Sequence, residues 1–422
     1  MRKKIFIKGP VLSRTGYGEQ TRFALRSLLR HTDRYDIFLD AIPWGQSGWL
    51  WEDNEERKYI DSLLVKTQQY IHSGGQFDLS LQVTIPNEWT RMAPINIGYT
   101  AGIESNVVSP TWLEKCKIID KIIVVSEHAK RGFEEASYDM VNEQEKKVVG
   151  QLTCEAPIDV VHYPVRKYKK SDVNFEFETD FNFLVIAQNG PRKNVENTIK
   201  WFVEKFHDNS DVGLVLKMFK HGNCTMDAQY NEKYLATLMK KHEGHKCKVY
   251  FLHGDLTDEE MTSLYQHKKI KAFVTLTHGE GYGLPIFEAA YNGVPVVAPP
   301  WSGHVDYLYM PNKDKNRKKV RKSAMFAKID YELDYVQKGA VWKDVIEEYS
   351  KWCYPKKDSY KMMIGDVYTN YEKHRSKAQK LKKHILENFE EEKIYNQFVS
   401  SIDKLFGDDV SMTSDDNTVV IL

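Results

Sequence analysis

Cysteine is scarce in this sequence, with five residues among 422. The five stand far apart, without a C-x2-C pair and without histidines at the spacing of a zinc site. The sequence therefore shows no sign of a disulfide framework or a structural zinc site, and we expect free thiols in a reducing compartment. They are Cys116, Cys154, Cys224, Cys247 and Cys353.

Long apolar runs are missing as well. No segment approaches the roughly 18 uninterrupted apolar residues that a membrane-spanning helix needs. The basic N-terminus has only a few apolar residues before Lys8, too few for the apolar core of a signal peptide. We therefore expect a soluble, cytoplasmic protein without a transmembrane segment. Peripheral contact with a membrane stays open.

An excess of charge of either sign is absent. The 60 basic residues balance 59 acidic ones, which argues against a surface built throughout for nucleic acid but leaves local patches open. The chain is 41% hydrophobic and 12% aromatic, enough material for a globular core. A length of 422 residues exceeds one ordinary core, so we expect two domains.

Apolar runs that alternate with helical patterns predict an α/β fold. Runs at residues 5–7, 78–83, 95–99, 121–125 and 158–164 predict strands of a first domain, and runs at 181–187, 212–216, 249–252, 272–276 and 294–297 predict those of a second. Helical patterns, for example at 194–206 and 258–267, separate the later runs. This alternation favours doubly wound parallel sheets with right-handed crossovers. We expect domains at 1–170 and 179–385, a polar linker at 166–178, a helix at 386–406 and a frayed tail at 407–422.

Residues 278–288 are the most informative stretch. Glu280 and Glu288 flank a glycine-rich turn between a predicted strand and a helix that starts near Pro285, where the missing N–H costs nothing. Glycines let backbone N–H groups approach a ligand, and the helix N-terminus adds positive potential. The turn therefore suits a phosphate or a row of sugar hydroxyls. Its glycines are Gly279, Gly281 and Gly283.

The motif that runs from Glu280 to Glu288, followed by the segment 292–298, resembles the E-x7-E signature of retaining GT-B glycosyltransferases, the family-four group related to glycogen synthases. The resemblance implies two Rossmann-like domains that face a cleft, with the acceptor on the first domain and a nucleotide-sugar donor on the second. It implies a metal-independent transferase of hexosyl or pentosyl groups. Glu280 would act on the transferred sugar as the catalytic residue, and Glu288 would bind the ribose. The donor site would also include Gly281, Tyr282, Gly283 and Leu284.

Two further segments gain a role from this resemblance. The N-terminal loop at residues 13–18 stands where the family brings a loop to the donor diphosphate, which makes Gly16 and Gly18 donor-binding candidates. A plain surface turn is the alternative. The apolar residues Ile394, Phe398 and Ile402 are spaced four apart on one helical face, and the family packs such a terminal helix on the first domain.

The diphosphate leaving group needs a cation. The sequence has no Asp-x-Asp motif to hold a metal, so we expect no metal or other cofactor and assign the diphosphate to Arg192 and Lys193, directly after a predicted strand. A solvated turn is the alternative. The family usually has arginine where this chain has Gln188, so Arg192 would substitute for it; the same departure motivates a non-catalytic binding protein as a rival. Lys217 is a weaker donor contact.

The acceptor is harder to predict. Glu104 follows a strand at the edge where open α/β sheets bind ligands, although an exposed loop glutamate is the alternative. Residues 313–322 hold seven basic residues in ten. This run is a solvated loop, or it binds DNA phosphates or anionic lipid through residues such as Lys318, Lys319 and Arg321. Residues 9–18 also resemble GT-B proteins of large tailed phages, some of which sugar-modify DNA bases.

Overall fold

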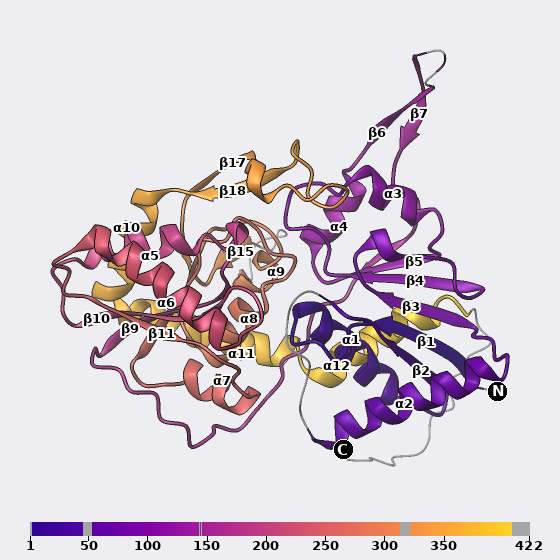
Figure 1. Cartoon of the computed structure of the whole chain (residues 1–422), viewed down its shortest axis with the longest axis horizontal. Helices are drawn as coiled ribbons and strands as arrows, with labels where there is room; N and C mark the ends of the chain where they lie inside the picture. The colour runs from indigo at the N-terminus through magenta and orange to yellow at the C-terminus, as the bar shows by residue number, and fades with distance from the viewer. Residues whose placement is uncertain (1, 45–52, 143, 145, 313–320, 407–422) are drawn as a thin grey trace. The chain divides into compact units, whose positions relative to one another are not determined.

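The computed structural model describes residues 2–44, 53–142, 144, 146–312 and 321–406. The chain divides into two compact units (Figure 1). The first unit comprises Met1–Gly102, Val108–Pro164 and the residues from Glu391 onward, and the second comprises Ile103–Val107 and Val165–Glu390. Each holds one six-stranded parallel sheet. The predicted α/β fold with two Rossmann-like parallel-sheet domains is confirmed.

The sheet of the first unit has the strand order β2-β1-β3-β4-β5-β8. Its strands are β1 (Lys3–Gly9), β2 (Tyr35–Ala41), β3 (Leu79–Val83), β4 (Ile95–Thr100), β5 (Lys121–Val124) and β8 (Ile158–Val160). The helices are α1 (Gly16–Leu29), α2 (Glu55–His72), α3 (Pro110–Cys116) and α4 (Glu127–Glu134), with a 3-10 turn η1 (Pro86–Glu88). A separate hairpin of β6 (Tyr138–Asn142) and β7 (Lys147–Leu152) projects from this unit (Figure 1).

The C-terminal helix α12 (Glu391–Asp403) belongs to the first unit. The ring of Phe398 lies 5.2 Å from that of Phe23 in α1, and Ile394 and Ile402 are buried as well. The apolar face that the sequence places on this helix is therefore the face that packs. The helix begins at Glu391, five residues later than the expected residue 386.

The sheet of the second unit has the order β11-β10-β9-β12-β13-β16. Its strands are β9 (Phe181–Gln188), β10 (Val212–Phe219), β11 (Lys248–Leu252), β12 (Ile270–Val274), β13 (Val296–Ala298) and β16 (Ala327–Lys328). The helices are α5 (Val195–Phe206), α6 (Thr225–Met239), α7 (Asp258–Tyr265), α8 (Leu284–Asn292), α9 (Val305–Leu308), α10 (Lys357–Thr369) and α11 (Tyr371–Asn388). Central strands are buried on both faces, which explains their unbroken apolar runs.

Two hairpins and three short turns complete the second unit. The hairpins are β14 (Tyr309–Asn312) with β15 (Arg321–Ala324), and β17 (Tyr331–Tyr335) with β18 (Lys351–Pro355). The 3-10 turns are η2 (Pro191–Lys193), η3 (Lys240–His242) and η4 (Lys338–Ala340). The described helices include none with the length and hydropathy that crossing a bilayer requires.

Some boundaries differ from those expected. The first unit ends at Pro164 instead of residue 170, and the predicted linker packs on the second unit, where the Ser171 N–H donates to Ser263 Oγ at 2.9 Å. Helix α1 begins at Gly16, so Gly16 and Gly18 lie in its first turn and not in a preceding loop. The reason is a cap: Thr15 Oγ1 accepts the Gly18 N–H at 3.2 Å, which satisfies a free helix-end donor.

Candidate functional site

Two loops meet at one edge of the sheet of the second unit. Strands β9 and β12 are parallel neighbours, so their carboxyl ends lie at the same edge. The turn η2, with Arg192 and Lys193, follows β9, and the glycine-rich segment 275–283 follows β12. This edge is where open α/β sheets place ligands. The fold therefore brings the predicted cations next to the predicted carboxylate.

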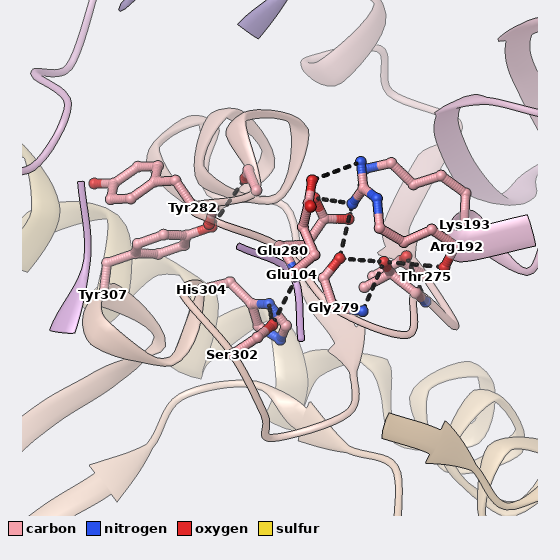
Figure 2. A network of polar contacts seen from close by, with 12 residues as sticks. Glu104, Arg192, Lys193, Thr275, Gly279, Glu280, Tyr282, Ser302, His304 and Tyr307 are labelled. Carbon is pink, nitrogen blue, oxygen red and sulfur yellow. Dashed lines mark hydrogen bonds and ion pairs between the residues drawn. The ribbon is translucent and has the colours of Figure 1, made fainter. Parts of the chain in front are cut away.

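Glu280 pairs with both cations (Figure 2). Its Oε1 accepts from Lys193 Nζ at 2.6 Å and its Oε2 from Arg192 Nη1 at 3.0 Å, while only 7% of the side chain is exposed. Burial alone would raise the pKa of Glu280, but the charges of Lys193 and Arg192 outweigh it and lower the pKa to about 2. The carboxylate is therefore ionised at neutral pH.

Arg192 also faces a second carboxylate. Its Nη2 lies 3.4 Å from Glu104 Oε1, and its Nη1 donates to the Gly279 carbonyl at 2.7 Å (Figure 2). Burial opposes the charge of Arg192, but Glu104 and Glu280 raise its pKa above the usual range. Two cations and two carboxylates thus form one cluster, which we call the Glu280 cluster.

Glu104 was expected on the acceptor side of the first domain, and this placement is corrected. Residues 103–107 belong to the second unit. A Cβ at Gly279 would overlap the carbonyl oxygen of Glu104, so this segment packs directly on the glycine-rich turn. Gly279 is thus required for close packing, whatever its part in binding a ligand. The pairing of Glu104 with Arg192 could not be predicted, because the two residues lie 88 positions apart in the chain.

A buried loop after β13 supports Glu280 from below in Figure 2. The Glu280 N–H donates to Ser302 Oγ at 2.9 Å, and the Gly303 N–H donates to the Glu280 carbonyl at 2.9 Å. Ser302 Oγ lies 3.5 Å from His304 Nδ1, and His304 Nε2 lies 2.8 Å from the Pro299 carbonyl, which can only accept. Burial lowers the pKa of His304, so it is neutral with its proton on Nε2. Sequence analysis missed Ser302 and His304; the sharp Ser-Gly-His turn after a strand was the available signal.

The residues between the two glutamates form the start of α8. Gly283 caps the helix with a φ of +84°, in the left-handed region that favours glycine, and the helix begins at Leu284, one residue before Pro285. Tyr307 Oη lies 3.0 Å from the Tyr282 carbonyl and 2.9 Å from the Gly283 carbonyl. The backbone of this turn is therefore held from α9.

Glu288 has a partner that sequence analysis missed. The phenol of Tyr265, at the end of α7, donates to Glu288 Oε2 at 2.8 Å. Burial, with the charge of Glu288 beside it, raises the pKa of Tyr265 well above its usual range. Burial also raises the pKa of Tyr307, and both Glu280 and Glu288 add to that shift, so the two glutamates lie within electrostatic reach of one phenol.

His278 makes structural contacts. Its Nδ1 lies 2.6 Å from the Cys353 carbonyl, and its ring stacks on Trp352 with an interplanar angle of 8°. Burial lowers its pKa, so the ring is neutral. These contacts fasten the β17–β18 hairpin to the turn that bears Glu280.

Other predicted residues lie outside the Glu280 cluster. Lys217 Nζ donates to the Gly254 carbonyl at 2.6 Å, and burial lowers its pKa. Gln188 donates to the Lys220 carbonyl at 3.1 Å. Arg321 is exposed on β15, whereas Lys318 and Lys319 fall outside the described residues.

Two predictions about ligands remain predictions. Gly16 and Gly18 belong to the first unit, and their part in donor binding is untested. Across the described ranges, no three His, Cys, Asp or Glu side chains gather in a group that could hold a metal ion. Metal independence still has to be tested by experiment.

Solved structures with a similar fold include two GT-B proteins. HepE of Anabaena, crystallised with UDP and glucose, matches 96% of this chain and 100% of its own at a TM-score of 0.59 and 14% identity. Sucrose-phosphate synthase from Thermosynechococcus elongatus matches 96% of this chain and 99% of its own at a TM-score of 0.61 and 13% identity. At such identities the likeness concerns the fold, which is GT-B.

The family assignment comes from the sequence of the second unit. Residues 167–327 match the family glycosyl transferases group 1. The serotype-specific mannosyltransferase WbdA of Escherichia coli is 28% identical over 116 residues, which cover 28% of this chain and 13% of that protein. The predicted membership of a GT-B glycosyltransferase group is confirmed for this domain, while the retaining mechanism stays a prediction.

Proposed function

We propose that this protein is a retaining glycosyltransferase that moves a sugar from a nucleoside-diphosphate sugar to an acceptor hydroxyl. The observation that carries the proposal is the Glu280 carboxylate, buried and ionised between Arg192 and Lys193 inside a group 1 glycosyltransferase domain. An ionised carboxylate between two cations, next to a helix N-terminus, suits a ligand that is sugar at one end and diphosphate at the other.

The cations have a role in leaving-group departure. A diphosphate brings about two negative charges, and more charge develops on it as the glycosidic bond breaks. Glu280 pairs with Arg192 and Lys193, and Glu104 pairs with Arg192, so the carboxylates hold the two cations in place. An incoming diphosphate would share these cations with the two carboxylates, so the cations need little reorganisation when the donor binds.

The remaining donor contacts would come from the start of α8 and from Glu288 within it. Backbone N–H groups at residues 281–284 lie at the helix start and would bind sugar hydroxyls or phosphate oxygens. Glu288, oriented by Tyr265, would accept from the ribose hydroxyls. Glu280 would orient the transferred sugar and stabilise positive charge at its anomeric carbon.

The reaction proceeds on one face of the sugar. The bond from the anomeric carbon to the diphosphate oxygen breaks, and its electron pair stays on that oxygen. The acceptor oxygen forms the new bond on the same face, and its proton passes to the departing phosphate oxygen. Because the new bond forms on the face from which the diphosphate leaves, the anomeric configuration is retained. No covalent enzyme intermediate is required.

Donor turnover tests the proposal. HepE binds UDP and glucose and WbdA is a mannosyltransferase, so UDP-glucose and GDP-mannose are the first donors to try, each with and without a chelator. We expect nucleotide release with one donor, unaffected by the chelator, and a product whose anomeric NMR coupling matches that of the donor. An inverted product would contradict the front-face mechanism, and loss of turnover with the chelator would contradict metal independence.

Two alternatives give distinct results. A non-catalytic GT-B binding protein, suggested by Gln188, would bind a donor in calorimetry without releasing nucleotide. A DNA-modifying transferase would bind DNA in a strongly salt-dependent way, and neutralising Arg321 and Lys322, both exposed, together with Lys318 and Lys319 would flatten that dependence. A cytoplasmic location fits both the proposed glycosyltransferase and the DNA-modifying alternative. Cell fractionation would test it.

A further inference from the structure

The β17–β18 hairpin is fastened to the loops of the Glu280 cluster. The Cys353 N–H donates to the His278 carbonyl at 3.0 Å, two residues before Glu280. The Lys351 N–H donates to Asn106 Oδ1 at 2.6 Å, two residues after Glu104. The turn η4, in the connection between the strands, packs against η2. The hairpin, drawn in orange in Figure 1, therefore has a set position beside the proposed site.

The connection between β17 and β18 exposes a tryptophan. Trp342 is 53% exposed, whereas Trp89, Trp112 and Trp352 are at most 1% exposed. An exposed fraction this large is unusual for tryptophan, which is strongly buried on average. The exposed indole is therefore available to a ligand.

The backbone that carries Trp342 is held in a tight turn. The Trp342 N–H donates to the Ile346 carbonyl at 2.9 Å, and the Ile346 N–H donates back at 2.7 Å. The Asp344 N–H donates to Glu347 Oε1 at 3.0 Å, and Val345 is buried beneath. A ring on such a turn loses little backbone freedom on binding, which favours recognition by a rigid aromatic surface.

The negative charge of the hairpin disfavours anionic ligands. Residues 331–355 contain five carboxylates and three lysines, in contrast to the basic run at 313–322. A net negative surface repels nucleic acid and anionic lipid. An aromatic face with carboxylates nearby instead suits a neutral polyhydroxylated ligand, which stacks its C–H groups on the ring and donates its hydroxyls to carboxylates.

We propose that Trp342 forms an acceptor subsite for a neutral carbohydrate. This inference rests on the proposed transferase function and adds the acceptor class: an oligosaccharide or glycan whose outer sugar unit stacks on the indole while another unit presents its hydroxyl to the reaction. Trp342 belongs to the second unit, whereas the resemblance assigns the acceptor to the first.

Calorimetry without donor tests the subsite independently of catalysis. Maltotriose, mannotriose and chitotriose are titrated at millimolar concentration into the wild-type protein and the variants Trp342→Ala and Trp342→Phe. We expect at least one trisaccharide to bind the wild type, about tenfold weaker binding to Trp342→Ala, and substantial recovery in Trp342→Phe. Tyr335→Ala is the matched control, because Tyr335 is exposed on the same hairpin but pairs with the Lys351 ammonium, 5.6 Å from its ring.

The outcomes separate the two proposals. Donor hydrolysis by Trp342→Ala should stay within twofold of wild type, since the Glu280 cluster is intact. Trisaccharide binding that depends on Trp342 in a protein without donor turnover supports the subsite and contradicts the transferase. Binding of none of the three trisaccharides, equal weakening by Tyr335→Ala, or Trp342-dependent binding of oligothymidylate in place of sugars overturns the subsite.

Discussion

Two strand-to-helix turns, one in each unit, share the sequence Gly-Tyr-Gly, at residues 16–18 and 281–283. Their polar environments differ. The turn before α1 is held mainly by residues close in the chain: Thr15 caps the helix, and Arg22 Nη1 donates to the Val11 and Ser13 carbonyls at 2.8 and 3.0 Å. A side-chain contact with a distant strand joins Tyr17 Oη to Thr100 Oγ1 at 2.7 Å. The turn before α8 is held by distant residues, with Arg192 and Lys193 from η2 and Ser302 from the loop after β13.

The difference predicts which turn matters more for the proposed reaction. Local bonds keep a turn in shape and satisfy its helix end. Support from several elements fixes a charged side chain in a buried position and controls its ionisation, as expected where a site is preorganised. Changes at the α8 turn should therefore alter the reaction far more than changes at the α1 turn.

Removing the central carboxylate is expected to have the largest effect. In Glu280→Ala, turnover should fall by about 10²- to 10³-fold, the usual scale for one preorganised electrostatic contact. Donor affinity should change less, because Lys193 and Arg192 lose a competing carboxylate, although Arg192 keeps its pair with Glu104. Single-turnover kinetics and donor calorimetry separate the two quantities. A loss confined to donor affinity would contradict the role given to Glu280.

The second-largest effect is expected from acid, which protonates the same carboxylate. The folded-state pKa of Glu280 is about 2, below the value near 4.5 of a free glutamate, so its ion pairs stabilise the fold above pH 4.5 and are lost as the pH falls toward 2. The shift corresponds to at most about 3 kcal/mol of unfolding free energy. Chemical denaturation between pH 6 and 3 should show a smaller acid loss in Glu280→Gln than in wild type. Equal losses would mean that other carboxylates dominate.

Much of this comparison could be predicted from the sequence. Runs such as 181–187 read as strands because parallel strands buried on both faces are apolar throughout. The spacing of Glu280 and Glu288 and the position of Arg192 and Lys193 after a strand predicted which residues come together at this edge of the sheet. Local pattern was sufficient for these features because short stretches of chain form them.

The supporting contacts could not be predicted, because they join residues far apart in the chain. Tyr265 meets Glu288, and Ser302 meets Glu280, only after helices and loops have packed. The β6–β7 and β17–β18 hairpins also escaped prediction. Strands β6, β7 and β17 are largely exposed, and β18, although mostly buried, is only five residues long. Tertiary placement decides such elements more than local propensity does.

Substitution of Glu288, the proposed ribose contact, should have a smaller effect than substitution of Glu280. Glu288→Ala is expected to weaken donor binding about tenfold with little change in turnover, because a ribose contact acts equally on the ground and transition states. Tyr265→Phe, which removes only the hydroxyl that holds Glu288, should weaken it about threefold. Both effects should shrink with a donor that lacks the ribose hydroxyls. Unchanged affinity in folded Glu288→Ala would contradict the assignment.

The α1 turn should give the smallest effect. A Cβ at Gly16 would meet no atom within 4 Å, so Gly16→Ala is expected to fold with unchanged stability. If this helix start approaches the donor diphosphate, the added methyl group should raise the donor KM about threefold and leave kcat unchanged, because it hinders binding without touching the Glu280 cluster. Gly339→Ala, at another position with open space, serves as the control. Equal KM values for the two variants would make the α1 turn a surface turn and leave donor binding to the second unit.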